Sequence, residues 1–200
     1  LEAATQKGST VILTCVSGIR NAQLHKADAL VTTDLQQLAG IEVEGQEALF
    51  GRKSNILTYE QQTGCCQSWF DLIRLKTASK LASFSGNYFK GMPAITCNEY
   101  GKGKVYYVAT VPEQSIVDKL ITEAVYYSSI VPLARCKHPL VEISELEDTS
   151  GKQYIYIVNF SDEEQTIELS TYASDIKTEK KYTTSASVKA MDYLLMQINQ

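Results

Sequence analysis

The sequence has no apolar run near the roughly 18 residues that a membrane-spanning helix requires. Clusters of lysine and arginine are missing too, and the formal net charge of the 200 residues is −4. Surfaces that bind nucleic acid are basic, so we expect neither a nucleic acid nor a membrane as a partner. The hydrophobic share of 44% and the charged share of 21% are those of an ordinary globular protein.

Motifs for metals and cofactors are also missing. A structural zinc site requires closely paired thiolates or nearby imidazoles. The histidines are His25 and His138, and no C-x-x-C spacing occurs among Cys15, Cys65, Cys66, Cys97 and Cys136. We therefore predict no metal and no cofactor. An odd number of cysteines without such spacing is typical of a reducing compartment, which favours the bacterial cytoplasm.

The beginning of the sequence lacks two further features. The first eight residues contain neither an initiator methionine nor the apolar region of a signal peptide. This beginning predicts that the chain is a piece of a longer protein.

The most informative stretch covers residues 91–110. Two apolar β runs, Ala94–Cys97 and Val105–Ala109, flank a polar segment that holds Gly101 and Gly103. Both glycines can take the positive φ values that a tight reversal needs. We predict a β-hairpin with these glycines as its structural turn residues. A phosphate-binding loop is excluded, because Gly-Lys-Gly-Lys has the wrong spacing and precedes a strand rather than a helix.

Before residue 132, apolar runs alternate with segments of helical periodicity. Thr10–Cys15 is a short apolar run of the kind found in strands buried on both faces. Further strands are expected at Ile41–Val43, Ser54–Tyr59 and Ala78–Phe84, and Trp69–Leu75 fits either a helix or a strand. This alternation predicts a three-layer α/β domain that is flavodoxin-like and resembles the class I glutamine amidotransferases in fold.

Two helices are expected within this first domain. Val31, Leu35 and Leu38 have helical spacing and precede Gly40, which is placed as a C-cap glycine. A second helix begins at Ser115, and its predicted buried stripe consists of Ile116, Leu120, Ile121, Ala124 and Val125.

The pattern changes from Val141 onward, where short strand-like runs are divided by polar turns. The expected strands are Val141–Leu146, Tyr154–Phe160, Gln165–Leu169, Ser187–Lys189 and Tyr193–Ile198. We predict two domains, an α/β domain of residues 1–135 and a small antiparallel β-sandwich domain of residues 136–200. Tyr154, Tyr156, Val158 and Phe160 share one strand face, which we predict to lie in the core.

Several stretches together resemble the family-42 glycoside hydrolases, which are β-galactosidases. The strongest is the hairpin Gly91–Val108, and weaker matches are Val11–Ile19, Asp34–Glu44, Ser68–Leu72 and Tyr154–Ser161. The resemblance covers residues 9–198 and implies a trimerisation domain followed by a C-terminal β domain. A homotrimer is therefore the expected partner state.

The resemblance also implies what is missing. In this family both catalytic glutamates lie in a (β/α)₈ barrel, which takes roughly 250 residues. The chain cannot contain one, so we assign it no catalytic residue and expect it to be inactive alone. A galactoside would bind to the missing barrel, and this chain would serve oligomerisation and shape the rim of the active site.

Alternatives remain for individual residues. An amidotransferase would use a cysteine such as Cys65 on a tight turn, but the sequence lacks the required His-x-Glu, which favours inert loop cysteines. Trp69 is the one candidate for substrate binding, by stacking on a sugar, against a role in the core or at an interface. Glu42, Glu44 and Glu47 favour a solvated strand face over acid–base chemistry. The β domain from residue 141 is an alternative carbohydrate-binding module.

Overall fold

The computed structural model describes residues 1–21, 23–128 and 130–199. The chain divides into two compact units, residues 1–129 and 130–200. Each unit has a hydrophobic core of its own. Within the described residues, no helix is long and apolar enough to cross a bilayer.

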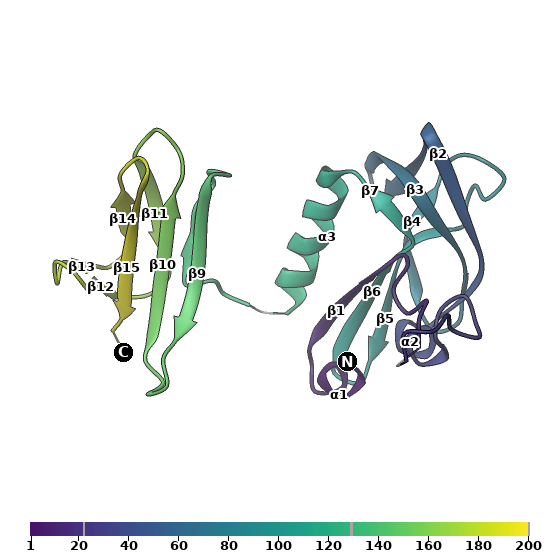
Figure 1. The fold of residues 1–200 in the computed structure, drawn as a ribbon, viewed down its shortest axis with the longest axis horizontal. Helices are drawn as coiled ribbons and strands as arrows, with labels where there is room; N and C mark the ends of the chain where they lie inside the picture. Colours follow the sequence, from purple (N-terminus) through teal and green to yellow (C-terminus); the bar gives the residue numbers. More distant parts are fainter. Residues whose placement is uncertain (22, 129, 200) are drawn as a thin grey trace. The chain divides into compact units, whose positions relative to one another are not determined.

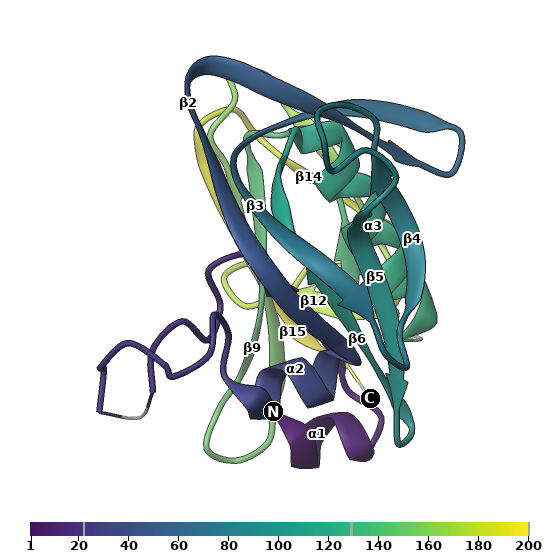
Figure 2. The ribbon, with the colours of Figure 1, turned by 90° about the vertical axis from the view of Figure 1, so that its right-hand side faces the viewer.

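Unit 1 is built on one sheet, whose described strands lie in the order β1-β6-β5-β4-β2-β3-β7. Its elements are α1 (Glu2–Gln6), β1 (Thr10–Thr14), α2 (Thr33–Ala39), β2 (Ile41–Tyr59), β3 (Gln62–Leu75), β4 (Ser79–Phe84), β5 (Pro93–Tyr100), β6 (Gly103–Val108), β7 (Thr110–Pro112) and α3 (Gln114–Tyr127). Helix α3 runs beside the sheet, and α1 and α2 lie at one end of it (Figures 1 and 2).

The predicted flavodoxin-like and glutamine amidotransferase-like three-layer fold is wrong. Among the described strand pairs of this sheet, only β1 and β6 run parallel, and the others are antiparallel. Parallel strands need a helical crossover between them, whereas α2 leads through Gly40 directly into β2, and β2 turns back tightly into β3. The stretches predicted as separate strands of an α/β repeat are therefore segments of one long hairpin.

The β2–β3 hairpin is the longest feature of the sheet (Figure 2). Ile41–Val43 and Ser54–Tyr59 both belong to β2, and Trp69–Leu75 belongs to β3, so the undecided stretch is a strand. The pairing slips between Val43 and Gly45 and again between Leu49 and Ser54. Such bulges bend and twist a hairpin.

The sheet curls until its two sides meet at Ala109. This residue alone separates β6 from β7. Its N–H donates to the carbonyl oxygen of Ala94 in β5 at 2.9 Å, and its carbonyl oxygen accepts from the N–H of Asp71 in β3 at 2.7 Å. One residue thus joins strands that are three places apart in the sheet order, and this closed seam encloses the interior.

The core of unit 1 includes a cluster of three aromatic rings. Phe70, Phe84 and Phe89 are each at most 2% exposed. Their ring centroids are 5.1 to 5.6 Å apart in edge-on or tilted arrangements. These are the geometries that aromatic pairs prefer.

The predicted hairpin of residues 91–110 is present. β5 and β6 are antiparallel, with Cys97 opposite Tyr106 and Tyr100 opposite Gly103. Gly101 has a φ of +62°. Gly103 does not have a positive φ; instead, a Cβ atom there would lie 2.2 Å from the carbonyl oxygen of Ser9. The N-terminal segment therefore packs tightly against this turn.

The helix predictions are confirmed in part. Gly40 ends α2 in the left-handed conformation, with a φ of 66°. In α3, Ile116, Leu120 and Ala124 are buried as predicted. Ile121 and Val125 are 46% and 38% exposed, so their place in the buried stripe is wrong.

The expectation for the first strand also needs correction. β1 lies at the edge of the sheet, and of its five residues only Leu13 is buried. It is therefore not a strand buried on both faces. A short apolar run alone does not distinguish a central strand from an edge strand.

Unit 2 consists of two antiparallel sheets in its described part, with strand orders β13-β12-β15-β10-β9 and β14-β11-β8. The strands are β8 (Ala134–Arg135), β9 (Val141–Glu147), β10 (Gln153–Asn159), β11 (Gln165–Leu169), β12 (Ala173–Asp175), β13 (Lys181–Tyr182), β14 (Ser185–Val188) and β15 (Asp192–Ile198). Side chains from both sheets form the core between them.

The predicted core face of β10 is wrong. Ile155 and Ile157 are fully buried, whereas Tyr154, Tyr156 and Val158 are only half-buried. Phe160, which follows the strand, is 49% exposed. Both faces of this strand are apolar, so alternation alone could not show which face turns inward.

We predict that Gly101→Val and Gly103→Val each lower the free energy of unfolding by at least about 2 kcal/mol. Gly101→Val combines a strained φ with a Cβ that would lie 2.6 Å from the Cα atom of Gln6, whereas Gly103→Val introduces crowding alone. Urea unfolding of the purified chain measures both.

Gly91→Val is the matched control, because Gly91 has a φ of +86° but a Cβ atom added there would meet no other atom within 4 Å. It should cost only the backbone strain, about 1–2 kcal/mol. Wild-type unfolding midpoints for both turn variants would show that neither glycine is needed.

Candidate functional site

Trp69, the single tryptophan of the chain, lies where the pairing of β3 is irregular. The register between β3 and β7 slips between Gln67 and Phe70. The preceding residue, Ser68, has a φ of +70°, which is unusual for a residue with a side chain. Bulges often serve to direct a side chain, and strained backbone is most often kept at functional positions. This geometry marks Trp69 as a candidate functional residue.

A buried carboxylate holds the indole of Trp69 in place. The indole N–H donates to Oδ1 of Asp71 at 3.0 Å, and Nε2 of Gln46 donates to the same oxygen at 2.9 Å. The hydroxyl of Tyr107 donates to Oδ2 at 2.7 Å. Asp71 is 0% exposed and Tyr107 is 1% exposed. Strands β2, β3 and β6 thus each supply a hydrogen-bond donor to one carboxylate, which we call the Asp71 hub.

The donors of the Asp71 hub are all neutral side chains. A buried charge is tolerated only when hydrogen bonds replace its lost hydration, and three donors satisfy most of its lone pairs. Burial raises the pKa of Tyr107, and the negative charge of Asp71 raises it further. Burial, followed by the same charge, raises the pKa of the nearby Cys15 thiol to about 11. The Tyr107 hydroxyl and the Cys15 thiol, both near the Asp71 carboxylate, therefore stay protonated at neutral pH.

Sequence reasoning identified Trp69 but missed the other members of the hub. A signal was present, because Asp71 interrupts the apolar run Trp-Phe-Asp-Leu-Ile of a strand. A charged residue in such a run suggests a buried, hydrogen-bonded carboxylate. Its donors Gln46 and Tyr107 lie 25 and 36 positions away, and no local pattern connects them. The proposed contact of Trp69 with a substrate stays a prediction.

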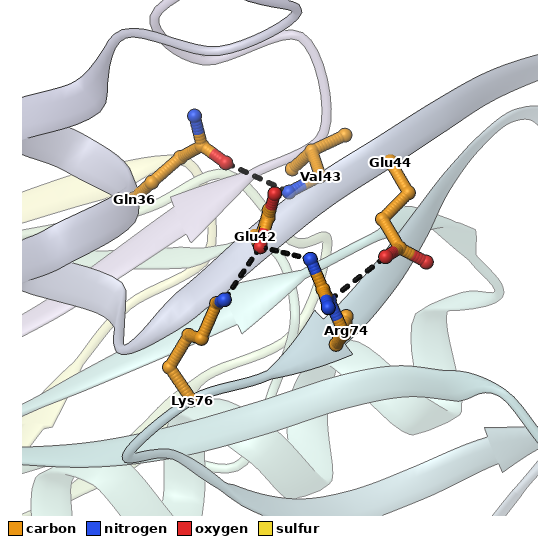
Figure 3. A network of polar contacts seen from close by, with 6 residues as sticks. All are labelled: Gln36, Glu42, Val43, Glu44, Arg74 and Lys76. Carbon is orange, nitrogen blue, oxygen red and sulfur yellow. Dashed lines mark hydrogen bonds and ion pairs between the residues drawn. The ribbon is translucent and has the colours of Figure 1, made fainter.

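Glu42 and Glu44, two of the three glutamates of the acidic cluster seen in the sequence, form a network of ion pairs with Arg74 and Lys76 (Figure 3). Glu42 pairs with Nη2 of Arg74 and with Nζ of Lys76, both at 2.6 Å, and Glu44 pairs with Nε of Arg74 at 2.8 Å. The hydrogen bond from Lys76, followed by the charge of Arg74, lowers the pKa of Glu42. Carboxylates held ionised by exposed cations are poorly suited to general acid catalysis.

Gln36 lies beside the network, whereas Glu47 has a separate partner. Oε1 of Gln36, on α2, accepts from the N–H of Val43 at 2.8 Å, which ties the helix to the start of β2 (Figure 3). Glu47 lies apart from the network and accepts a hydrogen bond from the hydroxyl of Tyr88. The three glutamates therefore do not form one acidic site.

The cysteine pair lies in strand β3 rather than in a loop, which corrects the expectation from the sequence. Cys65 is exposed, and its N–H donates to Oε2 of Glu113 at 2.9 Å. Cys66 is buried, and burial raises the pKa of its thiol to about 12. A thiol with so high a pKa carries almost no thiolate at neutral pH, so Cys66 is not an activated nucleophile.

We predict that Asp71→Ala lowers the free energy of unfolding by at least about 2 kcal/mol, because the buried Tyr107 hydroxyl and the half-buried Gln46 and Trp69 lose their acceptor. Asp71→Asn keeps one acceptor oxygen and should lose less. Urea unfolding followed by tryptophan fluorescence measures both, since Trp69 is the sole tryptophan. Glu44→Ala, which removes an exposed ion pair, is the control and should cost less than about 1 kcal/mol. An Asp71→Ala variant as stable as this control would refute the structural importance of the hub.

The chain resembles several β-galactosidases. The family model described as the β-galactosidase trimerisation domain matches residues 1–130. β-Galactosidase BgaB of Geobacillus sp. (strain Y412MC61) is 32% identical over 164 residues, which cover 81% of this chain and 24% of that protein. β-Galactosidase GanA of Bacillus subtilis (strain 168) is 28% identical over 182 residues, which cover 89% of this chain and 26% of GanA.

A solved structure extends the similarity to both units. The crystal structure of a β-galactosidase from Bacillus circulans sp. alkalophilus superposes with a TM-score of 0.86 at 26% identity, over 99% of this chain and 30% of that one. The chain thus spans only about a quarter of the length of its sequence relatives. The family match covers the unit that contains the Asp71 hub. This chain belongs to the β-galactosidase trimerisation domain family.

Proposed function

We propose that these 200 residues are the non-catalytic assembly portion of a longer bacterial β-galactosidase, which forms a homotrimer and hydrolyses terminal β-D-galactosides. The match of residues 1–130 to the trimerisation domain family carries the proposal. The sequence relatives support it, because the chain covers about a quarter of each. The functional boundary between a trimerisation domain (1–135) and a C-terminal β domain (136–200) stays a prediction.

The chemistry of the described residues supports a non-catalytic role. A retaining glycosidase needs two carboxylates about 5 Å apart, one of which is protonated to act as the acid. The best acidic cluster here is neutralised by Arg74 and Lys76. Asp71 is buried beneath three donors and has no access to a substrate. The catalytic pair of the longer protein belongs to its remaining three quarters.

Trp69 has a place in this proposal at the rim of the active site. Its indole is oriented by Asp71 and is half-buried, so part of the ring stays available for contact. Tryptophan combines a large apolar face with one polar atom, which suits both subunit contacts and sugar rings. In the assembled enzyme the exposed edge of Trp69 faces the entrance of a catalytic site and contacts the bound galactoside.

The proposal places the longer protein in the bacterial cytoplasm. The relatives named above are bacterial, and all five cysteines of the chain are free thiols. Free thiols persist in reducing compartments.

We predict that the longer protein has three times the mass of its protomer in light scattering and cleaves o-nitrophenyl β-D-galactoside. The 200-residue chain should show no turnover in the same assay, because it lacks the catalytic carboxylates. Removal of residues 1–130 from the longer protein should abolish the trimer. Turnover by the chain alone, or a trimer that survives the deletion, would contradict the proposal.

For Trp69 we predict that Trp69→Ala in the longer protein raises KM for the galactoside about 3- to 10-fold, the effect of losing one stacking contact of about 1 kcal/mol. The oligomeric mass should be unchanged. Trp69→Phe, which keeps an aromatic face, is the matched control and should restore most of the affinity. An unchanged KM with a loss of the trimer would instead assign Trp69 to the subunit contact.

A further inference from the structure

The side-chain amide of Gln46 lies beside the indole of Trp69, and one carboxylate oxygen orients both groups. Nε2 of Gln46 lies 2.9 Å and the indole nitrogen of Trp69 lies 3.0 Å from Oδ1 of Asp71. A carboxylate accepts hydrogen bonds and does not donate them, so the amide turns its N–H₂ group toward Asp71 and its oxygen away from it. Gln46 and Trp69 are half-buried, whereas Asp71 is 0% exposed.

The amide of Gln46 has hydrogen-bonding capacity that the fold does not use. Within the part of the chain that the structure describes, the amide makes one hydrogen bond, the one to Asp71. Its oxygen and its second N–H are therefore available to another molecule. The indole of Trp69 has no such capacity, because its single N–H is donated to Asp71. Trp69 thus offers an apolar ring, and Gln46 beside it offers an acceptor and a donor.

A small residue occupies the position directly opposite Trp69. Ala48 of β2 pairs with Trp69 of β3, and Gln46 pairs with Asp71. Directly paired residues of antiparallel strands place their side chains on the same face of the sheet, and residues two apart along a strand share that face. Gln46 and Ala48 therefore both lie next to the indole. The methyl group of Ala48 covers little of an indole ring, so Trp69 keeps more of its surface for contact than it would beside a larger residue.

An apolar ring beside an amide suits a pyranose sugar. A sugar ring has an apolar face of C–H groups, which packs on an aromatic side chain, and a rim of hydroxyl groups, which both donate and accept hydrogen bonds. An aryl or alkyl group also packs on Trp69, but it has no hydroxyl group for Gln46. Binding sites that hydrogen-bond a hydroxyl group discriminate against analogues that lack it. Gln46 is therefore placed to distinguish a sugar from an apolar group of similar size.

We infer that Gln46 and Trp69 together contact the leaving-group sugar of a galactoside, and that Gln46 favours disaccharide and oligosaccharide substrates over aryl and alkyl galactosides. The inference rests on the proposed function of the longer protein. An enzyme that removes terminal galactose holds the galactosyl group at the closed end of its site, so the leaving group projects toward the rim. Residues that a non-catalytic portion supplies at the rim therefore meet the leaving group rather than the galactose.

Two ligands that resist hydrolysis test this inference in the longer protein. Thiolactose, in which sulfur replaces the glycosidic oxygen of lactose, carries glucose as its leaving group. Isopropyl β-D-thiogalactoside has the same galactosyl group and sulfur atom but carries an isopropyl group. Gln46→Lys keeps a donor for Asp71 and has no acceptor oxygen. The ratio of the Kd for thiolactose to the Kd for the isopropyl compound, measured by calorimetry, should rise about 3- to 10-fold, because a hydrogen bond to the glucose is lost.

Further variants separate direct contact from an effect of the Asp71 hub. Gln46→Leu removes both the acceptor and the donor and should raise the ratio at least as much as Gln46→Lys. Glu44→Ala, on the same strand, is the matched control and should leave the ratio unchanged. A rise in Gln46→Leu alone would show that Gln46 acts through Asp71, which would overturn the inference.

An unchanged ratio in both Gln46 variants would also overturn the inference, as would a longer protein that does not bind thiolactose. Turnover of o-nitrophenyl β-D-galactoside and the light-scattering mass are recorded on the same samples. An inactive or monomeric longer protein in which Gln46→Lys still raises the ratio would contradict the proposed function and support the sugar contact. An active trimer with an unchanged ratio would do the reverse.

Discussion

Unit 1 depends on the closure of its sheet at Ala109, with the Asp71 carboxylate beside the seam. Ala109 hydrogen-bonds to Ala94 on one side and to Asp71 on the other. The side chain of Asp71 then gathers donors from β2, β3 and β6. A buried charge is destabilising unless all of these partners arrive together, so the hub favours one register of three strands over its alternatives. Trp69, two residues before Asp71 in β3, is oriented by the same carboxylate.

The sequence predicted those parts of unit 1 that are set by neighbouring residues. The β5–β6 hairpin follows from a glycine-containing turn between two apolar runs, and the end of α2 follows from Gly40. The fold class could not be obtained in this way. Helix and strand signals in alternation fit an α/β repeat equally well, and only the return of β3 along β2 and the closure at Ala109 distinguish the two. These contacts join distant positions that carry no local signature.

Local sequence patterns were also insufficient for the candidate site and for unit 2. Trp69 was recognisable as the single tryptophan, and its partner Asp71 lies two positions away in the same strand, but the other donors to that carboxylate, Gln46 and Tyr107, come from other strands. In β10, the alternation predicted the strand, but it placed Tyr154, Tyr156 and Val158 in the core instead of Ile155 and Ile157. Tyr156 and Ile157 are both good strand residues, and only the position of the second sheet determines that Ile157 turns inward. An apolar strand with two equivalent faces contains too little information to choose between them.

The packing of the N-terminal segment against the β5–β6 turn has a consequence for the order of folding. Glu2 accepts a hydrogen bond from the hydroxyl of Tyr100, which lies 98 positions further along the chain. β1 pairs in parallel with β6, its neighbour among the described strands of the sheet. β6 follows β2, β3, β4 and β5 in the chain, so it is synthesised after all of them. On the ribosome, the first strand must therefore wait, with its hydrogen-bonding groups unpaired, until nearly the whole unit has emerged. Such late, long-range pairing slows folding and leaves the apolar first strand open to aggregation until its partner is made.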